Sequence, residues 1–190
     1  VAERVVVSFG SQTGNAESIS GMLSDKLRDA GIEVESTSSL NEAIDGGVFD
    51  ASKGPATVLL ICSTCGDGDF PDNASKVKRW AKKLPGAESL SHLHIAVLAL
   101  GSTDYSNFCM AGQRLRSIFV DHGAKELMPV ALADDATSLE KVVDPWMTQA
   151  AGLFGQTPAP GNTAADDAGR SGAVAERVVV SFGSQTGNAE

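Results

Sequence analysis

The segment that most constrains the fold of this chain is a polar, glycine-containing loop at residues 8–17, which reads SFGSQTGNAE. The loop follows an apolar run typical of a strand and precedes Ile19, Leu23 and Leu27, which recur at helical spacing. A loop that joins a strand to a helix directs backbone N–H groups and the positive end of the helix dipole toward the same space. The segment therefore predicts a binding site for an anion.

The residue types in this loop suit a phosphate group held without cationic side chains. Ser11, Gln12 and Thr13 offer hydroxyl and amide donors. Gly14 permits close approach of the backbone, and Asn15 is expected to cap the helix. The absence of Lys and Arg excludes the GxxxxGK(S/T) loop of nucleoside triphosphatases, and the loop does not match the GxGxxG dinucleotide fingerprint either. The alternative is an ordinary turn, because clusters of Ser, Thr, Gly and Asn commonly form turns.

Length and charge narrow the class of protein and its partners. The chain has 190 residues, of which 42% are hydrophobic and 21% charged, as in a typical globular domain. Its net charge of -9 argues against nucleic acid and anionic membranes as partners and favours a protein with a basic docking face. The alternative is that the acidity only keeps the domain soluble.

The number of cysteines and the length of the apolar runs indicate the cellular compartment and whether a segment spans a membrane. Three cysteines are too few, and odd in number, for a disulfide framework, which predicts the reducing, cytoplasmic side of the cell. No apolar run approaches 18 residues, so no segment of this sequence is expected to span a bilayer. The sequence carries neither a signal peptide nor a starting Met, and we expect any anchor or leader to lie outside it.

Apolar runs typical of strands alternate with amphipathic runs typical of helices, which predicts an α/β fold with a five-stranded parallel sheet covered by helices on both faces. The predicted strands are 4–9, 33–36, 57–62, 95–100 and 127–132. The predicted helices are 16–30, 72–83, 109–122 and 139–154, with a weak crossover helix at 40–51. Gly31, Gly123 and the Pro85-Gly86 pair are expected to end three of them. In such a sheet the loops after the first, third and fourth strands meet at one edge, where ligands bind.

The loop after the third strand, at 62–74, reads CSTCGDGDFPDNA. Gly66 and Gly68 predict a mobile backbone that grips a planar ring, with the acidic residues left to meet a partner. A solvated turn is the alternative. Cys62 and Cys65 form a CxxC, but no second pair completes a zinc site, so metal binding and dithiol chemistry are not favoured.

Aromatic and acidic residues follow the fourth and fifth strands. Tyr105, the only Tyr in the chain, and Phe108 are suited to stack on a flat heteroaromatic ligand. The alternative is that the rings pack the loop onto the next helix, which we favour for Phe108. Asp134 and Asp135 can accept hydrogen bonds from ligand hydroxyls or place charge near a ring, although adjacent aspartates also cap helices.

Four segments in this order resemble the FMN-binding, flavodoxin-like domain of the diflavin reductases, such as NADPH-cytochrome P450 reductase and methionine synthase reductase. The segments read GSQTGNAE, STCGDGDFPDNA, LGSTDYSNFC and ADDATSLE, and the resemblance covers residues 4–154. It implies the flavodoxin-like strand order 2-1-3-4-5. The FMN-binding domain is accordingly expected to occupy residues 1–154.

The resemblance also implies a set of FMN-binding residues. The phosphate would be bound by Ser11, Gln12, Thr13, Gly14, Asn15 and Ala16. One side of the isoalloxazine would face Ser63, Thr64, Cys65, Gly66, Asp67 and Gly68. The other side would face Leu100, Gly101, Ser102, Asn107, Phe108 and Cys109, with Tyr105 stacked on the ring and Asp135 nearby. One departure is Cys65, where the P450 reductases usually have an aromatic residue.

The function that the resemblance implies is electron transfer. FMN would receive electrons from a domain that carries FAD and NADPH and pass them singly to a haem, cobalamin or iron–sulfur acceptor protein. This oxidoreductase module would not oxidise NADPH alone, since this sequence includes no FAD or NADPH domain. Anchoring to the endoplasmic reticulum through a further segment is left open. The alternatives are a free-standing flavodoxin and a phosphate-binding interaction domain without redox chemistry; a receiver domain is disfavoured because residues 8–13 hold no acidic cluster.

The last segment repeats the first. Residues 174–190 are identical to residues 1–17, and residues 155–173, rich in Gly, Ala, Pro and Thr, are predicted to be a flexible linker. The repeat indicates a tandem array, an engineered fusion or an artefact of sequence assembly. The first strand is interior in the order 2-1-3-4-5, so a second copy of it cannot simply join an edge of the sheet. It would have to displace the first copy, swap into another molecule or stay loose. Domain-swapped or tandem assembly through 174–190 is therefore a hypothesis.

Overall fold

A computed structural model describes residues 4–155, whose centre is a parallel β-sheet. The strands are β1 (Arg4–Gly10), β2 (Val34–Ser39), β3 (Ala56–Ser63), β4 (Leu93–Gly101), β5 (Lys125–Glu126) and β6 (Ala131–Asp134). Their order is β2-β1-β3-β4-β5, and β6 also pairs with β4, all in parallel. The predicted fold class is confirmed.

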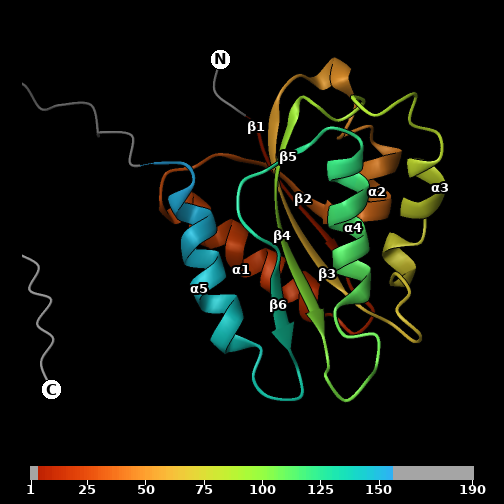
Figure 1. Cartoon of the computed structure of the whole chain (residues 1–190). Helices are drawn as coiled ribbons and strands as arrows, with labels where there is room; N and C mark the ends of the chain where they lie inside the picture. Colours follow the sequence, from red (N-terminus) through yellow and green to blue (C-terminus); the bar gives the residue numbers. More distant parts are fainter. Residues whose placement is uncertain (1–3, 156–190) are drawn as a thin grey trace, which may run out of the picture. The chain divides into compact units, whose positions relative to one another are not determined.

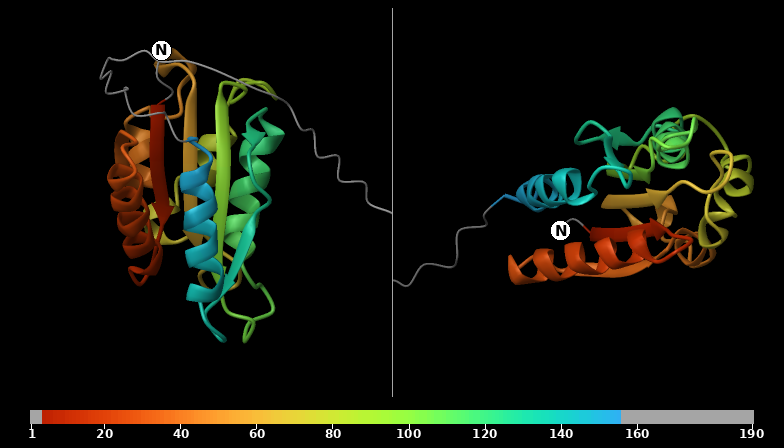
Figure 2. Two further views of the ribbon diagram at one scale, coloured as in Figure 1. Left: turned by 90° about the vertical axis from the view of Figure 1, so that its left-hand side faces the viewer. Right: turned by 90° about the horizontal axis from the view of Figure 1, so that it is seen from below.

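Helices cover both faces of this sheet (Figures 1 and 2). They are α1 (Asn15–Asp29), α2 (Leu40–Asp45), α3 (Val77–Ala81), α4 (Met110–Asp121) and α5 (Glu140–Gly152). The apolar residues of α1 and α5 share one buried cluster with one face of the sheet. Those of α2, α3 and α4 share a second cluster with the other face. Consecutive residues of β1 alternate between the two clusters, so Val6 packs on one side while Val5 and Val7 pack on the other.

The fifth predicted strand, 127–132, is wrong in its bounds. In the structure two short strands, β5 and β6, lie on either side of residues 127–130 and pair with successive parts of β4. The amide of Leu127 still donates to Ile95 O at 2.8 Å, and the pairing then lapses until Ala131. Pro129 lies in the gap and has no N–H to donate to a neighbouring strand, which explains the interruption.

The predicted helix 72–83 is also wrong in its bounds, because only Val77–Ala81 is α-helical, after a 3-10 turn at Asp72–Ala74. In a continuous helix the amide of Lys76 would bond to the carbonyl of Asp72. The side chain of Asn41 binds both groups instead, donating to Asp72 O and accepting from Lys76 N, each at 2.9 Å. A residue of α2 thus replaces the helical bond of a distant segment.

The weak crossover helix expected at 40–51 has a six-residue counterpart in α2. Its start is fixed by a capping box, in which the Ser39 hydroxyl accepts from Glu42 N at 3.3 Å and the Glu42 carboxylate accepts from Ser39 N at 2.9 Å. The helix ends at Asp45, and Gly46 is its C-cap residue. Gly31 and Gly123, with φ of 78° and 95°, follow the ends of α1 and α4 as predicted.

Two predicted regions fall largely or wholly beyond residue 155. The linker at 155–173 and the repeat at 174–190 lie outside the described residues, except for Gly155. No helix in the stretch from 4 to 155 combines the length and the apolar character needed to cross a membrane.

Candidate functional site

Three loops that follow β1, β3 and β4 meet at the carboxyl edge of the sheet, as predicted. Figure 1 shows β4 and β6 running toward this edge, with the loops beyond their ends. The loops enclose a cleft of about 390 Å³, within the usual range for small-ligand sites. Ten residues line it: Gln12, Thr13, Ser63, Thr64, Cys65, Gly66, Gly101, Ser102, Tyr105 and Asn107.

The loop after β1 presents unpaired backbone donors. Gly14 adopts a left-handed conformation, with φ of 98°, and its amide donates to Ser11 Oγ at 3.0 Å. Within the described chain, the amides of Thr13, Asn15 and Ala16 have no hydrogen-bond acceptor. These donors lie at the N-terminal end of a 15-residue helix, so they are suited to hold an anion.

Asn15 does not cap α1, so that expectation is wrong. The N-cap position belongs to Gly14, and no side chain accepts a hydrogen bond there. The Ser11 hydroxyl binds the Gly14 amide instead, which closes the turn before the helix begins. Asn15 is the first helical residue, and its side chain is exposed.

Hydrogen bonds fix the loop after β1 against the segment that follows β3. The Asn73 side chain accepts from Ser11 N at 2.8 Å. The Gln12 side chain donates to the Asp72 carboxylate at 3.1 Å and accepts from Asp72 N at 3.0 Å. Gln12 therefore positions one loop against another with the same amide group that was predicted to bind phosphate.

The loop after β3 forms a tight turn. The amide of Cys65 donates to Asp69 O at 3.0 Å, and the amide of Asp69 donates to Cys65 O at 2.8 Å. Gly66 and Gly68 occupy the turn with φ of 45° and 91°, a conformation that favours glycine. The Thr64 hydroxyl accepts from Ala111 N at 3.2 Å, so its side chain caps α4 at the same time as it borders the cleft.

The loop after β4 exposes one large aromatic side chain. Tyr105 is 69% exposed although it borders the cleft, and its amide donates to Ser102 O at 3.1 Å. Phe108 is half-buried and does not line the cleft. An exposed ring beside a cleft leaves its face free to stack on a planar ligand.

The structure gives Asp134 and Asp135 different surroundings. Asp134 accepts from the Thr103 amide at 3.0 Å, from the Thr103 hydroxyl at 2.7 Å and from Ala136 N at 3.0 Å. These donors, the Thr103 amide foremost, lower the pKa of the Asp134 carboxyl. Asp135 is exposed and outside the cleft lining, while its amide donates to Gly101 O at 2.8 Å. Asp134 thus ties two loops together, a role that sequence reasoning missed.

The three cysteines differ in access. Burial raises the pKa of the thiols of Cys62 and Cys109, that of Cys109 to about 12. Cys109 Sγ donates to Ala99 O at 3.3 Å, and the side chain packs in the core. Cys65 is only half-buried and borders the cleft; burial, with Asp72 and Asp69 nearby, raises its pKa.

Half of the predicted site residues line the cleft, and the others lie around it. Ser11, Ala16, Leu100 and Cys109 are buried and outside the lining. Gly14, Asn15, Asp67, Gly68, Phe108 and Asp135 are also outside the lining. Between residues 4 and 155, no group of His, Cys, Asp or Glu side chains is arranged to hold a metal ion.

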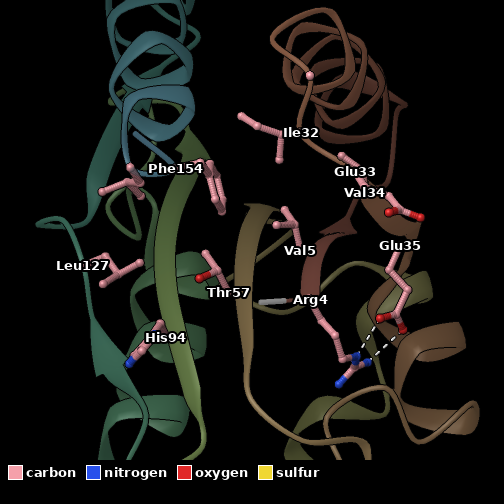
Figure 3. A pocket seen from close by; sticks show the side chains of 12 residues that line it. Arg4, Val5, Ile32, Glu33, Val34, Glu35, Thr57, His94, Leu127 and Phe154 are labelled. Atoms are coloured by element: carbon pink, nitrogen blue, oxygen red, sulfur yellow. Dashed lines mark hydrogen bonds and ion pairs between the residues drawn. The ribbon is translucent and has the colours of Figure 1, made fainter. Parts of the chain in front are cut away.

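A larger pocket of about 740 Å³ lies around the starts of β1, β3 and β4, at the opposite edge of the sheet (Figure 3). Apolar side chains, among them Ile32 and Phe154, face it beside an ion pair in which Arg4 donates to Glu35. None of the predicted site residues lines this pocket. The candidate site is therefore the smaller cleft, although this pocket has the larger volume.

The strand order, the polar turn after β1 and the cleft between three strand-end loops define a flavodoxin-like α/β domain. The comparison with protein families agrees. The family model described as Flavodoxin matches residues 7–146. The chain belongs to the flavodoxin family.

Similarity to curated proteins confirms the resemblance to diflavin oxidoreductases. The chain is 36% identical over 147 residues to NADPH-dependent diflavin oxidoreductase 1 of Danio rerio, covering 75% of this chain and 24% of that protein. It is 30% identical over 145 residues to methionine synthase reductase of Bos taurus, covering 76% and 20%. The chain thus spans about a quarter or less of these relatives.

Solved structures agree with the fold. A variant of the flavodoxin from Pseudomonas aeruginosa superposes with a TM-score of 0.63 at 26% identity, covering 80% of this chain and 98% of that one. The oxidised Flavodoxin 2 from Bacillus cereus has a TM-score of 0.59 at 22% identity, covering 80% and 97%, and supports the fold alone.

Proposed function

We propose that residues 1–154 form an FMN-binding electron-transfer domain of a diflavin reductase. The observation that carries the proposal is that an anion-binding turn and an exposed aromatic ring border the same cleft. FMN has a phosphate at one end and a flat ring system at the other, which matches these two features.

The residues present fit the phosphate end of FMN. The unpaired amides of Thr13, Asn15 and Ala16 supply neutral donors, and the hydroxyls of Ser11 and Thr13 add two more. The first turn of α1 adds the positive end of its dipole. No cationic side chain is needed, since helix N-termini bind phosphate through the backbone.

The cleft walls fit the isoalloxazine. Tyr105 would stack on one face of the ring, and Cys65 and Gly66 would border the other. Cys65 is smaller than an aromatic residue, so the ring face on that side would be more open. The turn at Gly66 supplies a flexible backbone whose peptides can reorient to hydrogen-bond the ring edge.

When bound, FMN would supply the redox chemistry, taking up electrons and releasing them singly. The chain itself would bind the cofactor, orient its ring and restrict access of water. We propose that electrons arrive from an FAD- and NADPH-carrying domain and leave for a haem, cobalamin or iron–sulfur protein. The exposed carboxylates of Asp67, Asp69, Asp72 and Asp104 near the cleft favour an acceptor with a basic face. Alone, the domain would not oxidise NADPH.

Flavin reconstitution tests this proposal. Purified protein is mixed with FMN, freed of unbound flavin by gel filtration and examined by absorption spectroscopy. The proposal predicts retention of about one flavin per chain and full reduction by dithionite. Protein that stays colourless after this treatment contradicts it.

A free-standing flavodoxin is the second candidate. It is favoured by the Pseudomonas aeruginosa protein, because 98% of that chain is covered by the match. The two candidates differ in the source of electrons. A coding sequence that continues into an FAD- and NADPH-binding domain supports the diflavin reductase, whereas reduction only by a separate reductase supports the free-standing carrier.

A further inference from the structure

We propose that Arg114 is a positioning residue that holds the Gly66 turn against the flavin cleft. Arg114 lies on α4, and its Nη1 atom donates to Gly68 O at 2.7 Å. The contact joins residues 46 positions apart, in a turn whose first residues border the cleft. This inference rests on the proposed function for its effect on FMN, but the contact itself can be tested without the cofactor.

The turn has few other restraints between its two ends. Cys65 and Asp69 are joined by a reciprocal pair of backbone hydrogen bonds, and Gly68 N also donates to Cys65 O at 3.0 Å. Within the described chain, no hydrogen bond involves the backbone of Gly66 or Asp67. Asp67 is exposed, and both glycines have positive φ. The peptide groups around Asp67 are therefore free to reorient unless something outside the turn holds them.

Arg114 supplies that outside restraint at the carbonyl of Gly68. The site is close-packed, because a Cβ on Gly68 would lie 3.0 Å from a side-chain atom of Met110 and 3.2 Å from one of Asn107. A guanidinium donor makes a stronger hydrogen bond to a carbonyl than a neutral donor does. With Gly68 O held, motion of the turn is confined to the peptides on its N-terminal side, where Cys65 and Gly66 border the cleft.

The neighbouring arginine on α4 has a different role. Arg116 binds the Glu126 carboxylate through two hydrogen bonds, of 2.8 Å and 2.6 Å. Arg114 forms no ion pair in the part of the chain that the structure describes and binds a backbone carbonyl instead. The carbonyl is neutral, so the positive charge of Arg114 stays beside the turn. Lys78 forms an ion pair with Asp69, at the end of the same turn, at 3.0 Å.

The first test uses flavin-free protein and amide hydrogen exchange of residues 65–69. In Arg114→Met we expect exchange of the Gly68 and Asp69 amides, which both donate to Cys65 O, to accelerate about fivefold, the size of one lost hydrogen bond. Arg114→Lys, which retains a cationic donor, should restore exchange to within about twofold. Arg79→Met is the matched control, because Arg79 is exposed and makes no hydrogen bond within the described residues. Unchanged exchange in Arg114→Met overturns the proposal.

The second test measures FMN affinity and the two one-electron midpoint potentials of the same variants. We expect Arg114→Met to weaken FMN binding about fivefold and to shift at least one potential, with Arg79→Met close to wild type and Arg114→Lys intermediate. Faster exchange with unchanged affinity and potentials limits Arg114 to folding and overturns its role toward the cofactor. If wild-type protein binds no FMN, the proposed function fails. The exchange result still shows whether Arg114 restrains the turn through Gly68 O.

Discussion

Asp134 and Thr103 join the ends of two neighbouring strands, since one carboxylate accepts both the amide and the hydroxyl of Thr103, at 3.0 Å and 2.7 Å. Thr103 lies in the loop that also carries Tyr105. The aromatic wall of the cleft is therefore held by a residue of β6 that does not itself line the cleft. Second-layer contacts of this kind position binding groups that act at the ligand.

Replacement of Asp134 is predicted to harm FMN binding more than replacement of Asp135. Asp134→Ala removes the acceptor of three hydrogen bonds and frees the Tyr105 loop, so FMN affinity should fall about tenfold. Asp135→Ala is the control, and fluorescence titration with FMN measures both variants. The resemblance to P450 reductases places Asp135 near the flavin. A larger loss with Asp135→Ala than with Asp134→Ala would therefore favour that role over the loop contact.

The conformation of Gly14 predicts a second result. A Cβ at Gly14 would meet no atom within 4 Å, so Gly14→Ala tests backbone conformation rather than space. Because φ at this position is 98°, we expect alanine to lower the free energy of unfolding by about 1–2 kcal/mol and to shift the amides that form the proposed anion site. Gly21→Ala, inside α1 and equally free of contacts, should instead stabilise the protein by about 0.5–1 kcal/mol. Thermal unfolding and FMN titration measure both; equal effects in the two variants would contradict the account.

Cysteine modification offers a test without mutation. Cys62 and Cys109 are buried, and Cys65 alone of the three borders the cleft. Native protein treated with iodoacetamide should be alkylated at Cys65, slowly at pH 7 because the raised pKa leaves little thiolate. FMN at saturating concentration should slow this reaction about tenfold or more. Peptide mass spectrometry identifies the site, and equal rates with and without FMN would contradict a ring beside Cys65.

The ion pair between Arg4 and Glu35 predicts a pH dependence of stability. Arg4 lowers the pKa of Glu35, so the pair stabilises the fold above the unfolded pKa, about 4.3, and this contribution is lost as pH falls through the lower folded value. The pair is partly exposed, and solvent screening limits it to about 0.5–1 kcal/mol. Glu35→Gln should lose this amount at pH 7 and nearly none at pH 3. Urea unfolding measures the free energy of unfolding of each variant, and Glu33→Gln is the control. An equal loss of stability at pH 7 and pH 3 would exclude the ion pair as the cause.

The sequence alone was sufficient for the fold class and the edge of the sheet where the loops meet, because apolar periodicity and helix-ending glycines are local signals. Gly31 and Gly123 illustrate this, since each follows its helix with the predicted conformation. The failures have tertiary causes. Asn41 interrupts the helix before α3 from another element. Likewise, only the folded structure brings Asp134 to Thr103, 31 residues away.

Packing of the loops also explains why some predicted site residues border the cleft and others do not. Tyr105 and Gly66 border the cleft because the loops that carry them follow neighbouring strands. Cys109 and Ala16 belong to the same sequence segments but point into the core. A motif identifies a loop, whereas the side that each residue faces depends on how the loop packs. Arg114 belongs to no motif, and only its distance to Gly68 O reveals it.

Calorimetric titration of the flavin-free protein with FMN and with riboflavin tests whether the turn at Gly14 holds the phosphate of a bound flavin. The two ligands share the ring, and only FMN has the phosphate that the turn at Gly14 would hold. We predict one FMN per chain and riboflavin binding weaker by at least about a hundredfold, since riboflavin lacks the charged group that would accept several hydrogen bonds. Equal affinities for the two flavins, or no binding of either, would contradict it.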